Sequence, residues 1–198
     1  MDDRMNRAKF FGLLSGLPSS ALTQIQEAYW LAKNAHRWQK PRDNGDRYFE
    51  HPRRVAITLI ERGVRDKDII TLALLHDVLE DTNTPHTIIA NSFPNIIWEW
   101  LYILSKYVAV FNPITGQIHD RMKKPSDAYF AAITAAEEPV RLVKLADRRD
   151  NLLDMQGWEP ERRARYIAET QQYVLPIAEK TDPWFLREIT AAIAAATQ

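Results

Sequence analysis

The chain has 198 residues, the size of one domain, and its 45% apolar content suits a soluble protein with a sizeable core. Lysine and arginine together number 26, as do aspartate and glutamate, so no net charge attracts long nucleic acids or anionic lipid. The absence of cysteine excludes disulfides, thiolate zinc sites and cysteine nucleophiles.

The N-terminal segment lacks the apolar stretch of a signal peptide, and no later stretch is apolar over the length that a membrane-spanning helix needs. We therefore expect a cytoplasmic protein without a membrane partner. No long polar linker or internal repeat interrupts the chain, so the sequence predicts a single domain over residues 1–198.

Apolar residues recur at helical spacing along most of the chain. The pattern is clear at Ile25, Ala28, Tyr29 and Ala32, and it returns over 55–60 and 97–104. Residues that end helices or form turns fall at 16–20, 41–48, 63, 82–85, 112–116, 125 and 157–160. The sequence therefore predicts an all-α fold, a single bundle of roughly eight to ten helices.

Residues 106–124 fit the helical pattern least. The segment contains Pro113, Gly116 and a basic run that begins at Arg121. These residues are typical of a loop. We expect an ordinary surface loop here, and a mobile lid over a site is the alternative.

The strongest functional signal is a polar quartet in an apolar helical stretch, made of His76, Asp77, Glu80 and Asp81. On a continuous helix, at about 100° per residue, His76 aligns with Glu80 and Asp77 with Asp81, so one face presents all four. Buried groups of this kind are costly without a partner. A divalent cation is the simplest partner, and a purely structural network of hydrogen bonds is the alternative.

Two further histidines are candidates for this site. His51 precedes Pro52, whose fixed backbone suits a first helical turn, and a capping role is the plain interpretation of His51. His36 is the weaker candidate, because the favoured interpretation is a hydrogen-bonding role or packing beside Trp38.

A third segment supplies another carboxylate. Asp147 shares one stripe of a predicted helix with Lys144, Arg148 and Asn151, because these residues are three or four positions apart. An ion pair with Lys144 or Arg148 on a solvated face is the plain interpretation, and a metal ligand is the functional one.

The order of His51, His76-Asp77 and Asp147 resembles that of the HD-domain metal-dependent phosphohydrolases. The surrounding residues resemble the hydrolase domain of the RelA/SpoT homologues, and the length of the chain makes it similar to the small alarmone hydrolases. The matching residues are Ala35-His36, Gln39, Gly45, Tyr48, His51-Pro52, the run 76–82, the run 144–148 and Asn151. The resemblance covers roughly residues 20–180.

This resemblance implies a hydrolase that removes the 3′-pyrophosphate from guanosine tetraphosphate or pentaphosphate and releases pyrophosphate with GDP or GTP. It implies manganese bound by four ligands, His51, His76, Asp77 and Asp147. Two imidazoles and two carboxylates also suit other divalent transition metals. Glu80 and Asp81, one turn away, are then the pair that transfers protons or orients water. Substrate contacts are expected from Arg42, Tyr48, Lys144, Arg148 and Asn151.

The chain departs from the family near the expected nucleotide pocket. Asp43 stands where a second basic residue is often found, Asp46-Arg47 replaces a usual Glu-Pro, and Asp154 replaces a frequent threonine. These carboxylates leave the base open, so an adenosine alarmone, NADPH or a nucleotide monophosphate is an alternative substrate. A nucleotide sensor that does not cleave is a further interpretation, and a homo-oligomer is left open. The length disfavours an added synthetase domain.

Overall fold

In the computed structural model, which describes residues 3–115 and 118–197, the chain is almost entirely helical, and this confirms the predicted fold class. The first half contains α1 (Asp3–Gly12), α2 (Ser19–Ala35), α3 (Glu50–Glu61), α4 (Lys67–Leu75), α5 (Val78–Asp81), α6 (His86–Ser92) and α7 (Asn95–Leu104). A hairpin of β1 (Tyr107–Phe111) and β2 (Ile118–Lys123) follows. The second half contains α8 (Ser126–Ala135), α9 (Glu138–Leu153), η1 (Met155–Gly157), α10 (Pro160–Glu169), the π-helical η2 (Thr170–Val174), α11 (Leu175–Thr181) and α12 (Pro183–Ala196).

Local chemistry explains several of the helix ends. Asp66 caps α4, because its carboxylate accepts hydrogen bonds from the backbone N–H groups of Asp68 and Ile69. Asp182 caps α12 in the same way. Gly63 follows α3 with φ +92°, a left-handed conformation that glycine adopts without strain.

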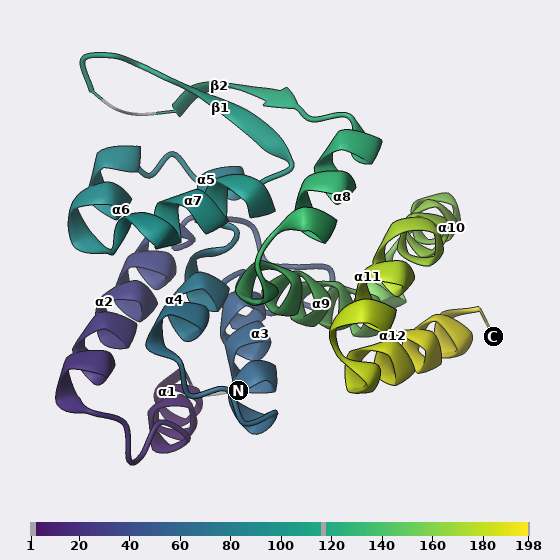
Figure 1. Cartoon of the computed structure of the whole chain (residues 1–198), viewed down its shortest axis with the longest axis horizontal. Helices are drawn as coiled ribbons and strands as arrows, with labels where there is room; N and C mark the ends of the chain where they lie inside the picture. The colour runs from purple at the N-terminus through teal and green to yellow at the C-terminus, as the bar shows by residue number, and fades with distance from the viewer. Residues whose placement is uncertain (1–2, 116–117, 198) are drawn as a thin grey trace.

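Helix α9 lies at the centre of the fold. It packs against α3 and α4 on one side and against α11 and α12 on the other (Figure 1). Helix α2 packs on the outer side of α4. Because α9 contacts elements from both halves of the chain, side chains on α3, α4 and α9 can reach a common point.

Helix α4 is interior, as its apolar sequence predicted. Every residue from Ile70 to Leu75 is buried. However, α4 ends at Leu75, and α5 begins at Val78, so the expected continuous helix through 76–81 is wrong. The backbone stays helical at His76 but flattens to ψ −7° at Asp77, which interrupts the regular hydrogen bonding between the two helices. His76 and Asp77 therefore form a turn at the buried end of α4.

The segment expected to be a surface loop contains an antiparallel hairpin. Tyr107 pairs with Lys123 and Val108 with Met122, and a bulge lies near Val110. Residues 116–117 of this segment, and with them Gly116 of the predicted break, lie outside the described residues. The hairpin lies alongside α5 and α7 at the edge of the bundle (Figure 1).

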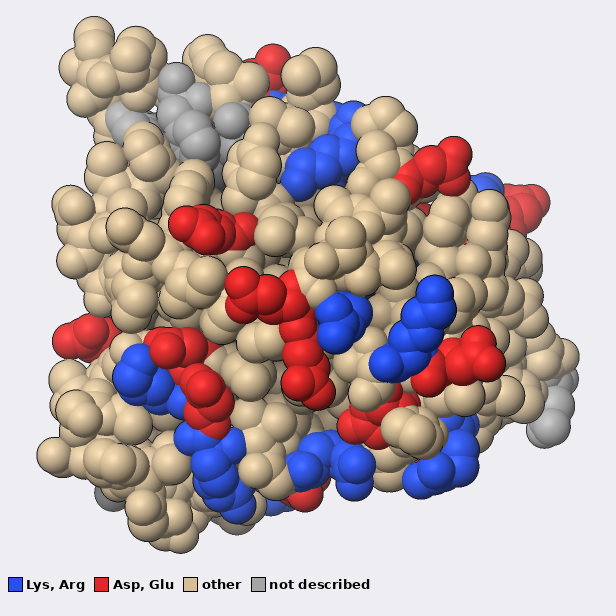
Figure 2. All heavy atoms as spheres, in the orientation of Figure 1, with Lys and Arg blue, Asp and Glu red and all other residues tan. Residues whose placement is uncertain are grey.

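The face drawn in Figure 2 carries charges of both signs. On the face drawn in Figure 2, acidic and basic side chains are interspersed, as the balanced composition indicated. Within the described ranges 3–115 and 118–197, no helix is long and apolar enough to cross a membrane.

Candidate metal centre and cavity

The four predicted metal ligands come from three parts of the fold. His51 lies in the first turn of α3, where Pro52 follows it as the sequence indicated. His76 and Asp77 form the turn between α4 and α5, and Asp147 lies within α9. The packing of α9 on α3 and α4 brings these segments together.

The potential ligand atoms converge. Nε2 of His51 lies 3.3 Å from Oδ1 of Asp147 and 3.5 Å from Oδ2 of Asp77. Nε2 of His76 lies 3.2 Å from Oδ1 of Asp77 and 3.8 Å from Oδ1 of Asp147. Two ligands of one ion are about 3 Å apart when each bond is about 2.1 Å long. His51, His76 and Asp77 each offer a ligand atom within 4.8 Å of the others, so these three could hold a common ion, and Asp147 lies beside both imidazoles.

The hydrogen bond at Nδ1 of His76 leaves its Nε2 atom available. Nδ1 of His76 donates to the carbonyl of Ala73 at 2.8 Å, which puts the lone pair of the neutral ring on Nε2. In the neutral ring that Nε2 is buried and has no hydrogen-bond partner within the described part of the chain. Burial of an unsatisfied nitrogen costs free energy, and a bound cation would remove that cost. The residues present therefore fit a divalent metal ion.

The carboxylates make the potential at this point negative. Burial by itself would lower the pKa of His76, but Asp77 and Asp147 raise it to about 9. Burial favours the neutral form of Asp147, yet Lys144 and the two imidazoles hold the pKa of Asp147 well below its ordinary value. Nζ of Lys144 lies 2.9 Å from Oδ2 of Asp147. A cation is the species that this arrangement favours.

Glu80 and Asp81 lie beside these residues on α5. Oε2 of Glu80 accepts a 2.8 Å hydrogen bond from the backbone N–H of Lys106, and burial raises the pKa of Glu80. Burial and the charge of Asp77 raise the pKa of Asp81 to about 7. In each carboxyl group the raised pKa favours the protonated form more than it is favoured in water, which suits a group that gives or takes a proton.

Tyr48 links Asp81 to the predicted ligand Asp77. Its hydroxyl contacts Oδ2 of Asp81 and lies 3.0 Å from Oδ2 of Asp77. On its other side the ring of Tyr48 stacks on His36, with centroids 4.8 Å apart. Nδ1 of His36 lies 2.7 Å from Oε1 of Gln39, so His36 has a packing and hydrogen-bonding role. Its packing partner is Tyr48, whereas the expected partner Trp38 is exposed.

A cavity of about 290 Å³ opens over this cluster. Its lining includes all of the predicted metal and proton-transfer residues and four of the five predicted substrate residues, Arg42, Tyr48, Lys144 and Asn151. The rest of the lining is Asp43, Leu104, Lys106, Asp154, Trp158, Arg162 and Tyr166. Because the lining is rich in charges of both signs, a polar ligand suits it better than an apolar one.

Arg42 reaches the cavity from the loop 40–47. Its Nε donates to Oδ2 of Asp154 at 2.8 Å, and its terminal nitrogen donates to Oδ1 of Asn151 at 2.6 Å. The loop lies close against Gly157, where an added Cβ would come within 3.1 Å of the Cβ of Asp43. Asp154, one of the positions at which the chain departs from the family, is thus a hydrogen-bond partner of the predicted substrate residue Arg42.

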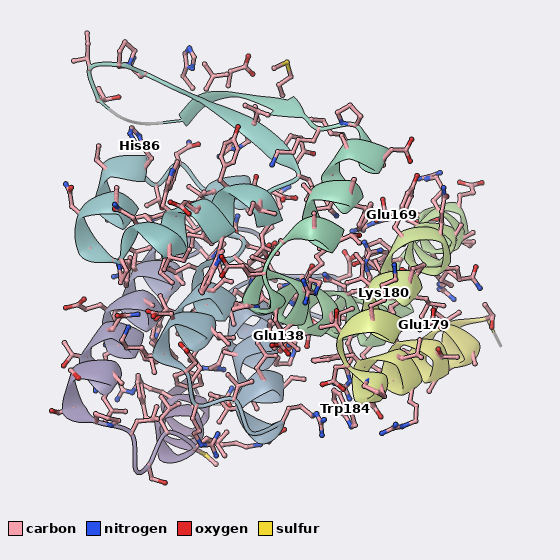
Figure 3. All side chains as sticks on the ribbon, in the orientation of Figure 1. His86, Glu138, Glu169, Glu179, Lys180 and Trp184 are labelled. Atoms are coloured by element: carbon pink, nitrogen blue, oxygen red, sulfur yellow. The ribbon has the colours of Figure 1, made fainter. Side chains whose placement is uncertain are left out.

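Arg148 differs from its prediction as a substrate contact. Its side chain is 0% exposed and is not part of the cavity lining. It donates to Oγ1 of Thr170 at 2.9 Å and to Oε1 of Glu169 at 2.6 Å, and it stacks on Tyr166 at 4.0 Å. Figure 3 labels Glu169 at the end of α10. Because Tyr166 lines the cavity, Arg148 supports the wall from behind.

Several residues of the site escaped the sequence analysis. Lys106 lines the cavity, and burial lowers the pKa of its ammonium group. Arg162 lies 3.7 Å from the ring of Trp158 and also lines the cavity. Trp158 lies just before α10 and Arg162 in its first turn, and their four-residue spacing was the available signal. Tyr166, expected only to pack, is a wall residue as well.

Known proteins resemble the chain over most of its length. It is 34% identical to a protein of Aquifex aeolicus (strain VF5) named guanosine-3′,5′-bis(diphosphate) 3′-pyrophosphohydrolase, over 88% of this chain and 24% of that protein. It is 30% identical to the bifunctional (p)ppGpp synthase/hydrolase SpoT of Escherichia coli (strain K12), over 83% of this chain and 22% of that protein. The chain thus spans about a quarter of the length of these curated relatives.

A solved structure has the same fold. It is described as a metazoan ortholog of SpoT that hydrolyzes ppGpp and plays a role in starvation responses. The TM-score is 0.73 at 22% sequence identity, and the match covers 91% of this chain and 98% of that chain.

The family comparison agrees with the position of the cluster. Residues 28–184 match the HD domain family, and this range contains His51, His76, Asp77 and Asp147. An HD domain implies a divalent metal, which fits the donor atoms described above. The chain belongs to the HD domain family.

Proposed function

We propose that the chain is a metal-dependent hydrolase that removes the 3′-pyrophosphate from (p)ppGpp and releases pyrophosphate with GDP or GTP. The observation that carries this proposal is the convergence of two imidazoles and two carboxylates at the floor of a polar cavity, next to Glu80 and Asp81. The names of the Aquifex and Escherichia relatives support the substrate.

In this proposal four residues hold Mn²⁺, namely His51 and His76 through Nε2, and Asp77 and Asp147 through carboxylate oxygens. The mixed nitrogen and oxygen set suits manganese and other divalent transition metals alike, and the choice of manganese rests on the resemblance to the family. When bound, such an ion supplies Lewis-acid chemistry, because it polarises a phosphoryl oxygen and makes water a better nucleophile. Lys144 keeps Asp147 ionised and oriented for this role.

Glu80 is the proposed residue that accepts or returns a proton during attack on the phosphorus. Its carboxylate lines the cavity, is fixed by the Lys106 N–H, and has a raised pKa, all of which suit general acid–base catalysis. Asp81 is the proposed second member of the pair, and Tyr48 orients it through the hydroxyl contact.

The nucleotide is proposed to lie against Arg42, Tyr48, Lys144 and Asn151 on the cavity wall. Arg42 is pre-oriented by Asn151 and Asp154, so its guanidinium can present a flat face or an edge without loss of much side-chain freedom. The carboxylates of Asp154 and Asp43 are the reason to keep a second candidate, hydrolysis of an adenosine alarmone or NADPH at the same centre.

The test is an incubation of the purified chain with Mn²⁺ and, in parallel, guanosine tetraphosphate, its adenosine counterpart and NADPH, with products separated by anion exchange. We expect pyrophosphate and GDP from the first substrate. Cleavage of only another substrate would replace the guanosine assignment and retain the hydrolase.

Two variants define the machinery in that assay. His51→Ala and Asp147→Ala are expected to lose tight Mn²⁺ binding and turnover together, whereas Glu188→Gln, on α12, is expected to keep both. A variant that kept full activity would remove that residue from the proposed ligand set. Bound Mn²⁺ with no cleavage of any of the three nucleotides would contradict the hydrolase assignment.

A further inference from the structure

A buried carboxylate lies behind His51, on the side away from the cavity. Asp150 is 7% exposed and is absent from the cavity lining. Its Oδ2 lies 2.7 Å from Nδ1 of His51, the ring nitrogen opposite the proposed ligand atom. Asp150 has no part in the proposed chemistry, yet it contacts a residue that does.

Arg54 holds this carboxylate in one orientation. Nε of Arg54 donates to Oδ1 of Asp150 at 2.8 Å, and a terminal nitrogen donates to Oδ2 at 3.0 Å. A two-point contact between a guanidinium and a carboxylate fixes both its distance and its angle. Oδ2 of Asp150 therefore remains aimed at the imidazole of His51.

The pair also has a regular place in the fold. Arg54 follows His51 by three residues on α3, and Asp150 follows Asp147 by three residues on α9. Residues three apart on a helix share a face, so each member lies one turn beyond a proposed ligand. The ion pair thus joins the two helices that carry His51 and Asp147 at the level of the metal centre.

The contact determines which tautomer His51 adopts. A carboxylate accepts a hydrogen bond, so Nδ1 of neutral His51 carries the proton and Nε2 presents its lone pair toward Asp77 and Asp147. Nδ1 of His76, in contrast, faces a neutral group, the backbone carbonyl of Ala73. A carboxylate that accepts from the far nitrogen of a ligating imidazole raises the basicity of the imidazole and fixes the ring orientation. His51 is therefore better oriented for metal binding than His76.

Arg54 connects this arrangement to the loop that supplies Arg42. Its other terminal nitrogen lies 2.9 Å from Oδ2 of Asp46. The terminal nitrogen that donates to Asp150 also lies 3.5 Å from Oδ2 of Asp154, the partner of Arg42. One guanidinium therefore contacts the carboxylate behind His51 and two carboxylates beside the proposed nucleotide pocket.

We infer that Asp150, held by Arg54, is a positioning residue that fixes His51 for metal binding and sets the affinity of the centre for its divalent ion. This inference rests on the proposed metal centre, and it does not depend on which nucleotide is cleaved. Removal of the group that hydrogen-bonds the other ring nitrogen of a ligating histidine typically weakens metal binding by about 10- to 100-fold.

The test is the dissociation constant for Mn²⁺, measured on the purified full chain by competition with a chelator. Asp150→Asn keeps the size of the side chain and removes its charge, and we expect affinity to fall about 10- to 100-fold. Arg54→Gln keeps the carboxylate and releases it, so a smaller fall is expected. Because the two residues act through one contact, the double variant should lose less than the product of the two separate losses.

Glu188→Gln is the matched control. Glu188 accepts from two nitrogens of Arg149, at 3.0 and 2.7 Å, so this substitution breaks a similar pair on the same helix α9, directed toward α12. We expect the Mn²⁺ affinity of this control to equal that of the unmodified chain. The melting temperature of each metal-free variant separates loss of folding from loss of affinity. If Asp150→Asn does not fold, Arg54→Gln carries the test.

The possible failures are distinguishable. If the unmodified chain binds Mn²⁺ and both Asp150→Asn and Arg54→Gln bind it equally well, the inference is wrong and the metal centre stands. If the unmodified chain binds no Mn²⁺, the metal centre and the inference both fail. Weakened Mn²⁺ binding in the variants supports the inference even when guanosine tetraphosphate is not the substrate.

Discussion

Lys106 holds Glu80 through its backbone: the N–H of Lys106 donates to Oε2 of Glu80 at 2.8 Å. Lys106 lies at the junction between α7 and β1, so the carboxylate proposed to transfer a proton is fixed by the base of the hairpin. Because the donor is a main-chain group, substitution of the Lys106 side chain leaves it in place. The hairpin therefore contributes to the geometry of the site from outside the helical bundle.

Replacement of Glu80 by Gln is expected to lower kcat by about two to four orders of magnitude and to leave Mn²⁺ affinity unchanged. The amide oxygen of glutamine can still accept from Lys106, so the position of the side chain is kept while proton transfer is lost. Steady-state kinetics with a parallel Mn²⁺ titration measure both quantities.

The exposed Glu99→Gln on α7 is the control for that experiment, and its kinetics should match those of the unmodified chain. Loss of Mn²⁺ from Glu80→Gln would contradict the assignment, because it would make Glu80 a metal ligand.

Replacement of Arg121 by Gln is expected to lower kcat about tenfold without a change in Mn²⁺ affinity. Arg121 on β2 donates to the carbonyl of Thr82 and lies 3.5 Å from that of Leu79, so it fixes the end of the short helix that carries Glu80 and Asp81. Kinetics of Lys123→Gln, an exposed cation on the same strand, provide the control. Equal rates for both variants would show that β2 does not position α5.

The turn at 76–77 and the hairpin show where helical periodicity stops being informative. The apolar run through Leu75 predicted the buried helix correctly, because a helix that is apolar on every face has no side suited to water. The change of ψ at Asp77 is not marked by any helix-ending residue in the sequence. The pairing of Val108 with Met122 depends on a partner 14 positions away, so a segment rich in loop residues concealed two strands.

The site was predictable to the extent that its residues lie in short motifs. His76, Asp77, Glu80 and Asp81 stand within six positions, and their apolar neighbours marked them as buried. The contact between Arg54 and Asp150 joins residues 96 positions apart and exists only because α3 packs on α9. Arg148 was expected to contact the substrate because it follows Asp147 in the sequence. That position does not reveal that its side chain points toward α10.

Replacement of Arg148 by Met is expected to reduce the free energy of unfolding by about 3 kcal/mol and to leave the KM for the nucleotide unchanged. The substitution leaves the hydroxyl of Thr170 and the carboxylate of Glu169 without their donor inside the wall of the cavity. Urea unfolding of the metal-loaded chain measures the first quantity. A raised KM together with an unchanged free energy of unfolding would contradict this prediction and would indicate that Arg148 contacts the substrate.

Mn²⁺ affinity is expected to rise with pH up to about 9 and then to level off. In the metal-free chain the pKa of His76 is raised to about 9 by Asp77 and Asp147 against the effect of burial, so the ring is protonated at neutral pH. A metal binds the neutral imidazole, so each unit of pH below this value costs about tenfold in affinity for the proton displaced from His76. Asp147 and Asp150 also raise the pKa of His51 against the effect of burial, and the proton displaced from this second ligand steepens the loss.

The raised pKa of His76 makes the stability of the metal-free chain fall as the pH rises, whereas Mn²⁺ affinity increases. A pKa raised above the ordinary value of 6.5 contributes stability that is fully present below pH 6.5 and is lost as the pH rises through about 9. Between these limits the metal-free chain should lose stability while its affinity for Mn²⁺ increases, so the gain in melting temperature on adding Mn²⁺ should grow steadily. Thermal melts with and without Mn²⁺ at several pH values between 6.5 and 9 measure this difference. A gain that does not change with pH would mean that no proton leaves His76 when the ion binds, and would place the ion away from its Nε2.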